Sequence, residues 1–189
     1  GLQAMLARVR DARLERAQRI VALLAEDFSI TWEDVAARAG GADAVGRPHV
    51  ADALVDLGIV ATRDEAGASL LQGGTKYVVP HCAPEVLDAV AMLRAAGAVP
   101  VFAHPGADAR GHIVPTSVIE GMAEAGLVGL EVDHRDHDER QRTRLTRIAD
   151  RLSLVRTGSS DYHGTGKLNR LGENLTAPDA FEALQAARG

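Results

Sequence analysis

The sequence predicts an α/β protein with a parallel sheet in its second half and a helical region before it. Three short apolar runs alternate with helical patterns in residues 83–189, which is typical of parallel strands joined by helices. Each run is followed within a few residues by histidine or acidic residues. Because the carboxyl ends of parallel strands meet at one edge of a sheet, we expect these side chains to lie close together.

Residues 1–82 are expected to form a wholly helical lobe. Apolar side chains recur near helical spacing over residues 2–26, which predicts one long amphipathic helix. Thr31 and Asp34 are spaced as in a capping box at the start of a second helix, and Gly58 is placed to end a third. The first of the shorter helices predicted in this lobe begins at Ser29 or Thr31 and runs to residue 37, and the others cover residues 48–57 and 62–71.

The strands are expected in residues 83–189. The first apolar run ends at His104, because Pro105 cannot extend a strand ladder and Gly106 permits a tight turn. The runs predicted as strands cover residues 99–104, 126–132 and 152–155, and the helices predicted around them cover residues 83–96, 117–125 and 138–151.

A carboxylate and an imidazole, Asp161 and His163, stand two positions apart after the third run. In an extended segment their side chains would point the same way, roughly 7 Å apart, and could face one pocket. An anionic oxygen beside an imidazole suits zinc, manganese or iron(II) better than calcium. Such pairs also cap helices or form hydrogen bonds in loops, so the spacing alone leaves both interpretations open.

Three stretches of the sequence carry a family resemblance. They are Phe102-Ala103-His104-Pro105-Gly106, then Gly129-Leu130-Glu131-Val132 with His137 beyond it, and Gly158-Ser159-Ser160-Asp161-Tyr162-His163. Taken together, they resemble the PHP family, the polymerase and histidinol phosphatase superfamily of metal-dependent phosphoesterases. Within the family, the chain is similar to the branch that hydrolyses nucleoside 3′,5′-bisphosphates and trims short RNA from the 5′ end, whose helical insertion contains a stretch like residues 46–55.

The resemblance implies the fold of the carboxyl-terminal part of a distorted seven-stranded, TIM-like β/α barrel with an α-helical insertion lobe. Residues 1–82 would form the lobe and residues 83–189 the barrel part. The resemblance also implies two or three divalent metal ions (Mn, Zn or Fe) at the carboxyl rim, with His104, Asp161 and His163 as metal ligands and catalytic residues.

Five further residues are candidates for binding a substrate phosphate. His134 and His137 follow the second strand, in a loop over the same rim. Arg47 and His49 stand at the start of a predicted helix, where they could instead only pack within the lobe. Lys76 follows a glycine turn, where a solvated lysine is the commoner case.

The amino-terminal signature of the family is absent from these 189 residues: there is no His-x-His after a first strand. We therefore expect the chain to be the carboxyl-terminal part of a longer protein. Each catalytic metal needs roughly three protein ligands, so the chain alone should be inactive. The exposed edges of an incomplete barrel would favour self-association.

Composition limits the partners of the protein. A net charge of −5 gives no general attraction for a long nucleic acid duplex, which favours a small phosphorylated substrate such as a nucleotide or short RNA. The single cysteine fits a reducing cytoplasm, and no apolar run approaches the roughly 20 residues that span a membrane. Two alternatives stay open: a non-catalytic binding or scaffolding domain with a degenerate PHP barrel, and an enzyme like histidinol phosphatase.

Overall fold

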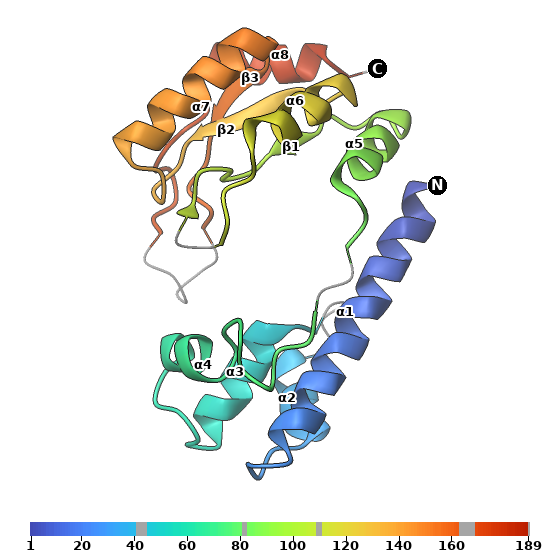
Figure 1. The fold of residues 1–189 in the computed structure, drawn as a ribbon, viewed down its shortest axis with the longest axis vertical. Coiled ribbons are helices and arrows are strands. Elements are labelled where there is room, and N and C mark those ends of the chain that lie inside the picture. The colour runs from blue at the N-terminus through green and yellow to red at the C-terminus, as the bar shows by residue number, and fades with distance from the viewer. Residues whose placement is uncertain (41–44, 81–82, 109–110, 163–168, 189) are drawn as a thin grey trace. The chain divides into compact units, whose positions relative to one another are not determined.

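The structure is a computed structural model that describes residues 1–40, 45–80, 83–108, 111–162 and 169–188. The chain divides into two compact units, Gly1–Pro84 and Glu85–Gly189 (Figure 1). Helices α1 (Leu2–Leu24), α2 (Trp32–Ala39), α3 (Arg47–Asp56) and α4 (Arg63–Ser69) belong to the first unit.

The core of the first unit lies between one face of α1 and helices α2 to α4. Its most deeply buried large side chains are Ile20, Leu24, Val35, Val50 and Leu54, none more than 1% exposed. The predicted capping box is confirmed, because Oγ1 of Thr31 accepts the N–H of Asp34 at 3.3 Å and Oδ2 of Asp34 accepts the N–H of Thr31 at 2.8 Å. Gly58 is left-handed (φ 67°) just after α3, as predicted for a residue that ends a helix.

The second unit holds a parallel sheet with strand order β1-β2-β3. Its elements are α5 (Val86–Ala95), β1 (Val101–Phe102), α6 (Thr116–Glu124), β2 (Gly129–Asp133), α7 (Glu139–Leu152), β3 (Val155–Gly158) and α8 (Pro178–Ala186). Val101 pairs with Gly129, and Gly129 pairs with Val155, so the three strands start in register. This arrangement brings the carboxyl ends of all three strands to one edge.

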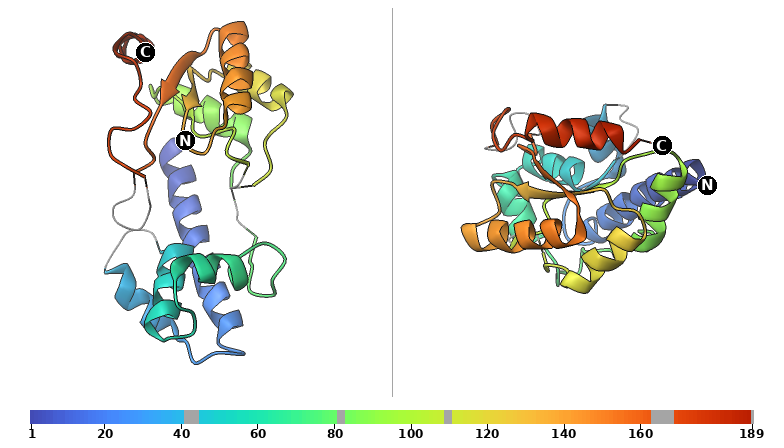
Figure 2. Two further views of the ribbon diagram at one scale, coloured as in Figure 1. Left: turned by 90° about the vertical axis from the view of Figure 1, so that its left-hand side faces the viewer. Right: turned by 90° about the horizontal axis from the view of Figure 1, so that it is seen from above.

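Helices cover both faces of the sheet (Figure 2). Leu130 of β2 is fully buried in a core that α6 and α7 complete with Ile119 and Leu145. The preceding residue of the strand, Gly129, faces the other way, because a Cβ added there would lie 3.3 Å from Leu184 of α8. The sheet is therefore the middle layer of the second unit.

The third strand differs from its prediction. The run 152–155 was expected to be a strand, but α7 continues to Leu152 and β3 begins at Val155. Ser153 separates the two with a left-handed backbone (φ 55°), and its N–H bonds back into the last turn of α7. Helix α8 was not predicted.

The described strands form an open three-stranded sheet, so the seven-stranded barrel stays a prediction. Strands β1 and β3 are the two edges of this sheet, and self-association through them also stays a prediction. No helix in the described part of the chain is both long and apolar enough to cross a membrane.

Candidate active site

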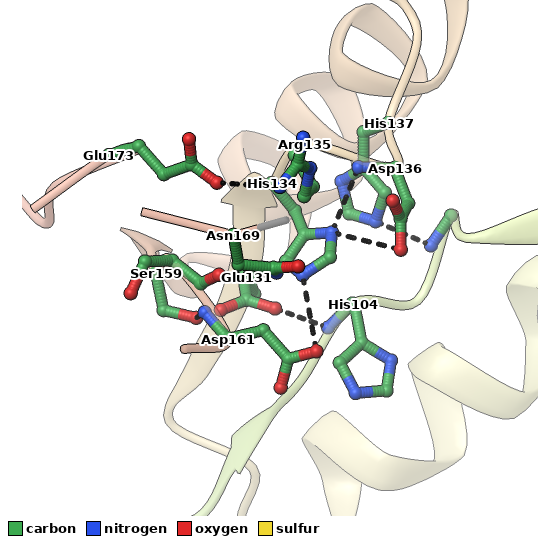
Figure 3. Close-up of polar contacts among 12 residues, drawn as sticks. His104, Glu131, His134, Arg135, Asp136, His137, Ser159, Asp161, Asn169 and Glu173 are labelled. Carbon is green, nitrogen blue, oxygen red and sulfur yellow. Dashed lines mark hydrogen bonds and ion pairs between the residues drawn. The ribbon is translucent and has the colours of Figure 1, made fainter. Parts of the chain in front are cut away.

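Polar side chains from all three strand ends converge at one edge of the sheet (Figure 3). His104 follows β1, His134 follows β2 and Asp161 follows β3. The ring centroids of His104 and His134 lie 5.5 Å apart, and Oδ2 of Asp161 lies 4.0 Å from Nε2 of His134. The structure therefore brings two predicted metal ligands, His104 and Asp161, next to the imidazole of His134, a predicted phosphate-binding residue. His163 lies outside the described residues.

The backbone is strained at both described metal-ligand candidates. His104 has φ 35° and Asp161 has φ 47°, a region that side-chain-bearing residues rarely occupy. Among the described non-glycine residues, only Ser153 and Asn174 share a positive φ, and Ser153 caps a helix. Strain of this kind concentrates at functional sites, where the surrounding structure holds it in place. The left-handed Asp161 also means that the alternation expected of an extended segment does not apply there.

Glu131 holds His104 in this conformation. Its carboxylate is 4% exposed, and its Oε2 accepts the main-chain N–H of His104 at 2.5 Å. A side chain of β2 thus fixes the residue that follows β1.

His137 holds the same turn from a second side. Its Nε2 accepts the N–H of Gly106 at 3.0 Å, so the proton must be on Nδ1, which donates to the carbonyl of Val132 at 2.8 Å. The ring is 3% exposed and lies 5.3 Å from that of His134. Both ring nitrogens of His137 are thus occupied by main-chain groups, which differs from the phosphate contact expected from the sequence.

His134 is fully buried at the centre of the cluster. Its Nδ1 accepts the N–H of Asp136 at 3.1 Å, so a neutral ring carries its proton on Nε2, the nitrogen nearest to Asp161. Nη2 of Arg142 donates to the carbonyl of His134 at 3.0 Å and fixes the loop that carries the ring. The result is an N–H group aimed at the carboxylate of Asp161, whose side chain is 14% exposed.

The donor types fit a transition metal, but the described donors are too few. The ring nitrogens of His104 form no hydrogen bond with a described residue, and imidazole with carboxylate suits zinc, manganese or iron(II). Within the described residues, no group of three His, Cys, Asp or Glu side chains is arranged to hold a metal ion. Ligands outside the described residues, such as His163, would have to complete such a site.

The predicted phosphate-binding residues of the first unit already have partners in that unit. Nη1 of Arg47 donates to the carbonyl of Leu71 at 3.3 Å, and Nδ1 of His49 accepts the N–H of Gly46 at 3.2 Å at the start of α3. Nζ of Lys76 lies 2.5 Å from Oδ2 of Asp27.

The hydrogen bond that Lys76 donates to Asp27 raises the pKa of Lys76. Glu26 lies beside the pair, with Oε2 3.6 Å from Nζ. The ammonium group of Lys76 is therefore already paired with two carboxylates.

Fold and site together define an α/β protein with imidazole and carboxylate groups clustered at the carboxyl ends of its strands. No family model matches the chain. Over 177 residues it is 30% identical to a 3′,5′-nucleoside bisphosphate phosphatase of Chromobacterium violaceum, a match covering 90% of this chain and 60% of that protein. Over 91 residues it is 37% identical to a phosphoribosyl 1,2-cyclic phosphate 1,2-diphosphodiesterase of Eggerthella lenta, covering 48% of this chain and 33% of that protein.

Two solved structures are similar to the whole chain. One is a Bifidobacterium adolescentis protein assigned by inference as a metal-dependent phosphoesterase, with a TM-score of 0.93 and 42% identity over 98% of this chain and 66% of that one. The other is an amidohydrolase from Chromobacterium violaceum with bound sulfate and no metal, with a TM-score of 0.79 and 28% identity over the same shares. The chain thus spans at most 66% of the length of these relatives. Their names support a relation to PHP-like phosphoesterases.

Proposed function

We propose that the protein is a metal-dependent phosphoesterase of the PHP type that hydrolyses phosphate esters of small nucleotides, either 3′,5′-bisphosphates or the 5′ ends of short RNA. The observation that carries the proposal is the convergence of His104, His134 and Asp161 from three adjacent strands, with a strained backbone at two of them. The similarity to a 3′,5′-nucleoside bisphosphate phosphatase supports the substrate class.

In this proposal, His104, Asp161 and His163 bind two or three divalent ions together with ligands from outside the described residues. When bound, such ions lower the pKa of water and hold the phosphoryl oxygens during in-line displacement. The chain spans only part of the length of its relatives, and the described residues do not complete a cluster of metal ligands. We therefore propose that the chain is inactive alone. Residues 83–189 would form the barrel part and residues 1–82 the helical lobe.

The residues around these ligands would prepare the site. The buried Nε2–H of His134 points to Asp161 and would keep that carboxylate oriented, or donate to a phosphoryl oxygen beside it. Glu131 and His137 would act only through His104, because both bond to the main chain of its turn. We therefore propose a positioning role for His137 in place of contact with substrate.

Residues of the helical lobe are further candidates for binding a phosphate group. Arg47 is an exposed guanidinium that can form charge-assisted hydrogen bonds with phosphate, and His49 holds the helix start that carries it. Lys76 is a weaker candidate because Asp27 and Glu26 already surround its ammonium group. A net charge of −5 favours a small substrate over a long duplex.

A second candidate substrate is a cyclic phosphate diester of ribose. The observation that favours it is the 37% identity to a phosphoribosyl 1,2-cyclic phosphate diphosphodiesterase over about half of this chain. In the hydrolysis of either substrate, water attacks phosphorus, so the same cluster of residues could serve both reactions.

The test is phosphate release by the complete protein, loaded with Mn²⁺, Zn²⁺ or Fe²⁺, from an adenosine 3′,5′-bisphosphate and from a ribose cyclic phosphate. Metal content is measured in parallel. Asp161→Asn should lose bound metal and lower turnover at least about 100-fold, since even residues behind the ligands are worth 10–100-fold.

The matched control is Asp150→Asn, because the carboxylate of Asp150 is 63% exposed and lies 3.8 Å from the guanidinium of Arg156. It should change neither metal content nor turnover. Hydrolysis of neither substrate by the metal-loaded protein, or full activity of Asp161→Asn, would overturn the proposal and favour a non-catalytic binding domain.

A further inference from the structure

The first unit contains a pocket whose walls carry three arginines. The pocket has a volume of about 320 Å³ and lies between the middle of α1 and the start of α3. Arg13 and Arg16 come from α1 and Arg47 from the first position of α3, with Ala17, Ile20, Gly46 and Pro48 completing the lining. Residues far apart in sequence thus place three arginines around one cavity.

These charges repel one another. Arg13 and Arg16 are three residues apart on one helix face, where like charges are destabilising. Burial lowers the pKa of Arg16, and the charges of Arg47 and then Arg13 lower it further. Among the ion pairs of the described residues, none joins one of these three arginines to a carboxylate.

Two of the three guanidinium groups are held in place by main-chain carbonyls. Nε of Arg16 donates to Val79 at 2.6 Å, and Nη1 of Arg47 donates to Leu71 at 3.3 Å. A guanidinium has five N–H donors, so each group keeps further donors for a ligand while its orientation is set. Such preorganisation lowers the cost of ordering side chains on binding.

Exposed arginines are usually just solvated, and that simpler account would suffice for each of these residues alone. Solvation does not explain why three arginines without a carboxylate partner line the same cavity, with one of them half-buried. An anion bound among them would remove the repulsion and supply the missing acceptors.

We propose that this pocket of Arg13, Arg16 and Arg47 binds the phosphate group of a small molecule. The choice of phosphate over another anion rests on the proposed function, because a nucleoside bisphosphate carries a second phosphate that is not hydrolysed. The site itself lies wholly within the first unit and needs no metal.

The experiment titrates inorganic phosphate and AMP into the complete protein in the presence of EDTA, with binding followed by calorimetry. Without metal no turnover occurs, so the result is independent of the proposed hydrolysis. Tighter binding of AMP than of phosphate identifies a nucleotide as the source of the phosphate group, and equal affinities identify free phosphate.

The decisive variant is Arg13→Gln, because the side chain of Arg13 is exposed and forms no hydrogen bond with a described residue, so folding should be preserved. It should weaken binding of both ligands about tenfold or more, the expected loss of one hydrogen bond between charged groups. Arg19→Gln is the matched control, since it removes the same charge from an exposed site on α1 outside the pocket, and it should change affinity less than about twofold.

Equal weakening by Arg13→Gln and Arg19→Gln would show general attraction by α1 and overturn the proposal. Failure of the unaltered protein to bind either ligand at millimolar concentration would overturn it too. A protein that binds phosphate in this pocket but hydrolyses neither candidate substrate would refute the proposed function and leave the pocket standing.

Discussion

Nε2 of His137 accepts the main-chain N–H of Gly106 at 3.0 Å and so ties the loop after β2 to the turn after β1. Together with the hydrogen bond that the N–H of His104 donates to Glu131, it fixes the turn at both ends. Buried side chains that bond to main-chain groups of a neighbouring segment set the direction in which that segment presents its own side chains. The orientation of the His104 ring therefore depends on two residues that need not touch a substrate.

The bond between Glu131 and His104 can be tested by comparing Glu131→Ala with Glu131→Gln. The alanine removes the acceptor of the His104 N–H in a buried place, which should lower the free energy of unfolding by about 1–3 kcal/mol. Glutamine keeps an oxygen within reach and should recover most of this loss. Urea denaturation of the complete protein measures both, and equal destabilisation by the two variants would mean that the hydrogen bond is unimportant.

The positioning role of His137 predicts which kinetic constant changes. His137→Ala leaves the N–H of Gly106 and the carbonyl of Val132 without the partner that joins them, so His104 should lose its fixed direction. We expect kcat and bound metal to fall about 10–100-fold, as for other residues that orient ligands, while KM stays unchanged. A raised KM with normal kcat and metal content would instead show that His137 binds the substrate.

The contacts of Lys76 predict how stability depends on pH. Hydrogen bonds from Lys76 and then Tyr77 lower the pKa of Asp27, and hydrogen bonds to Asp27 raise the pKa of both partners. The lowered carboxyl contributes stability that is complete above about pH 4 and is lost as pH falls through its folded pKa. The raised groups contribute stability that is complete below about pH 10 and is lost as pH rises through their folded pKa values.

Melting temperature measured across pH should therefore fall on both sides of a plateau, and Asp27→Asn should reduce both slopes. Asp11→Asn serves as the control, because Asp11 is an exposed acid of α1. Its only ion pair in the described structure is a long one, with Oδ1 of Asp11 3.9 Å from Nε of Arg10. If the two variants share one pH profile, the cluster around Asp27 does not contribute to stability.

Local signals predicted the helices of the first unit. Thr31 with Asp34 and the left-handed Gly58 act within one turn of the chain, so their meaning can be seen in the sequence itself. The third strand was placed too early because apolar residues continue from the end of α7 to β3, and the residue that separates them is Ser153 rather than a glycine. Helix α8 lacks buried residues and hence a strong apolar period.

The sequence indicated where the candidate site lies, but not which hydrogen bonds hold its residues in place. Proline and glycine after His104 marked the end of a strand, which indicated the edge where polar residues would meet. The roles of Glu131 and His137 depend on bonds to residues 27 and 31 positions away, and no local pattern reports such partners. The positive φ of Asp161 was also not visible in the sequence, because residues with a side chain rarely adopt it.

Gly158, the last residue of β3, lies so close to the main chain of Asn174 that a larger residue should not fit there. A Cβ added there would lie 2.5 Å from the main-chain oxygen of Asn174 and 2.9 Å from Cβ of Asp133, and Thr176 bonds to both its N–H and its carbonyl. Because a main-chain atom cannot move aside cheaply, Gly158→Ala should destabilise the protein by about 1–3 kcal/mol.

The matched control for Gly158→Ala is Gly67→Ala, at a glycine inside α4 whose added Cβ would meet no atom within 4 Å. Alanine there should be neutral or stabilise the protein by about 0.5–1 kcal/mol, because glycine is a poor helix former. Metal content of Gly158→Ala should fall as well, since a shifted strand end moves Asp161, which lies three residues further on. Unchanged stability of Gly158→Ala would show that segment 174–176 can yield, and that the path from β3 to the site is not fixed by this contact.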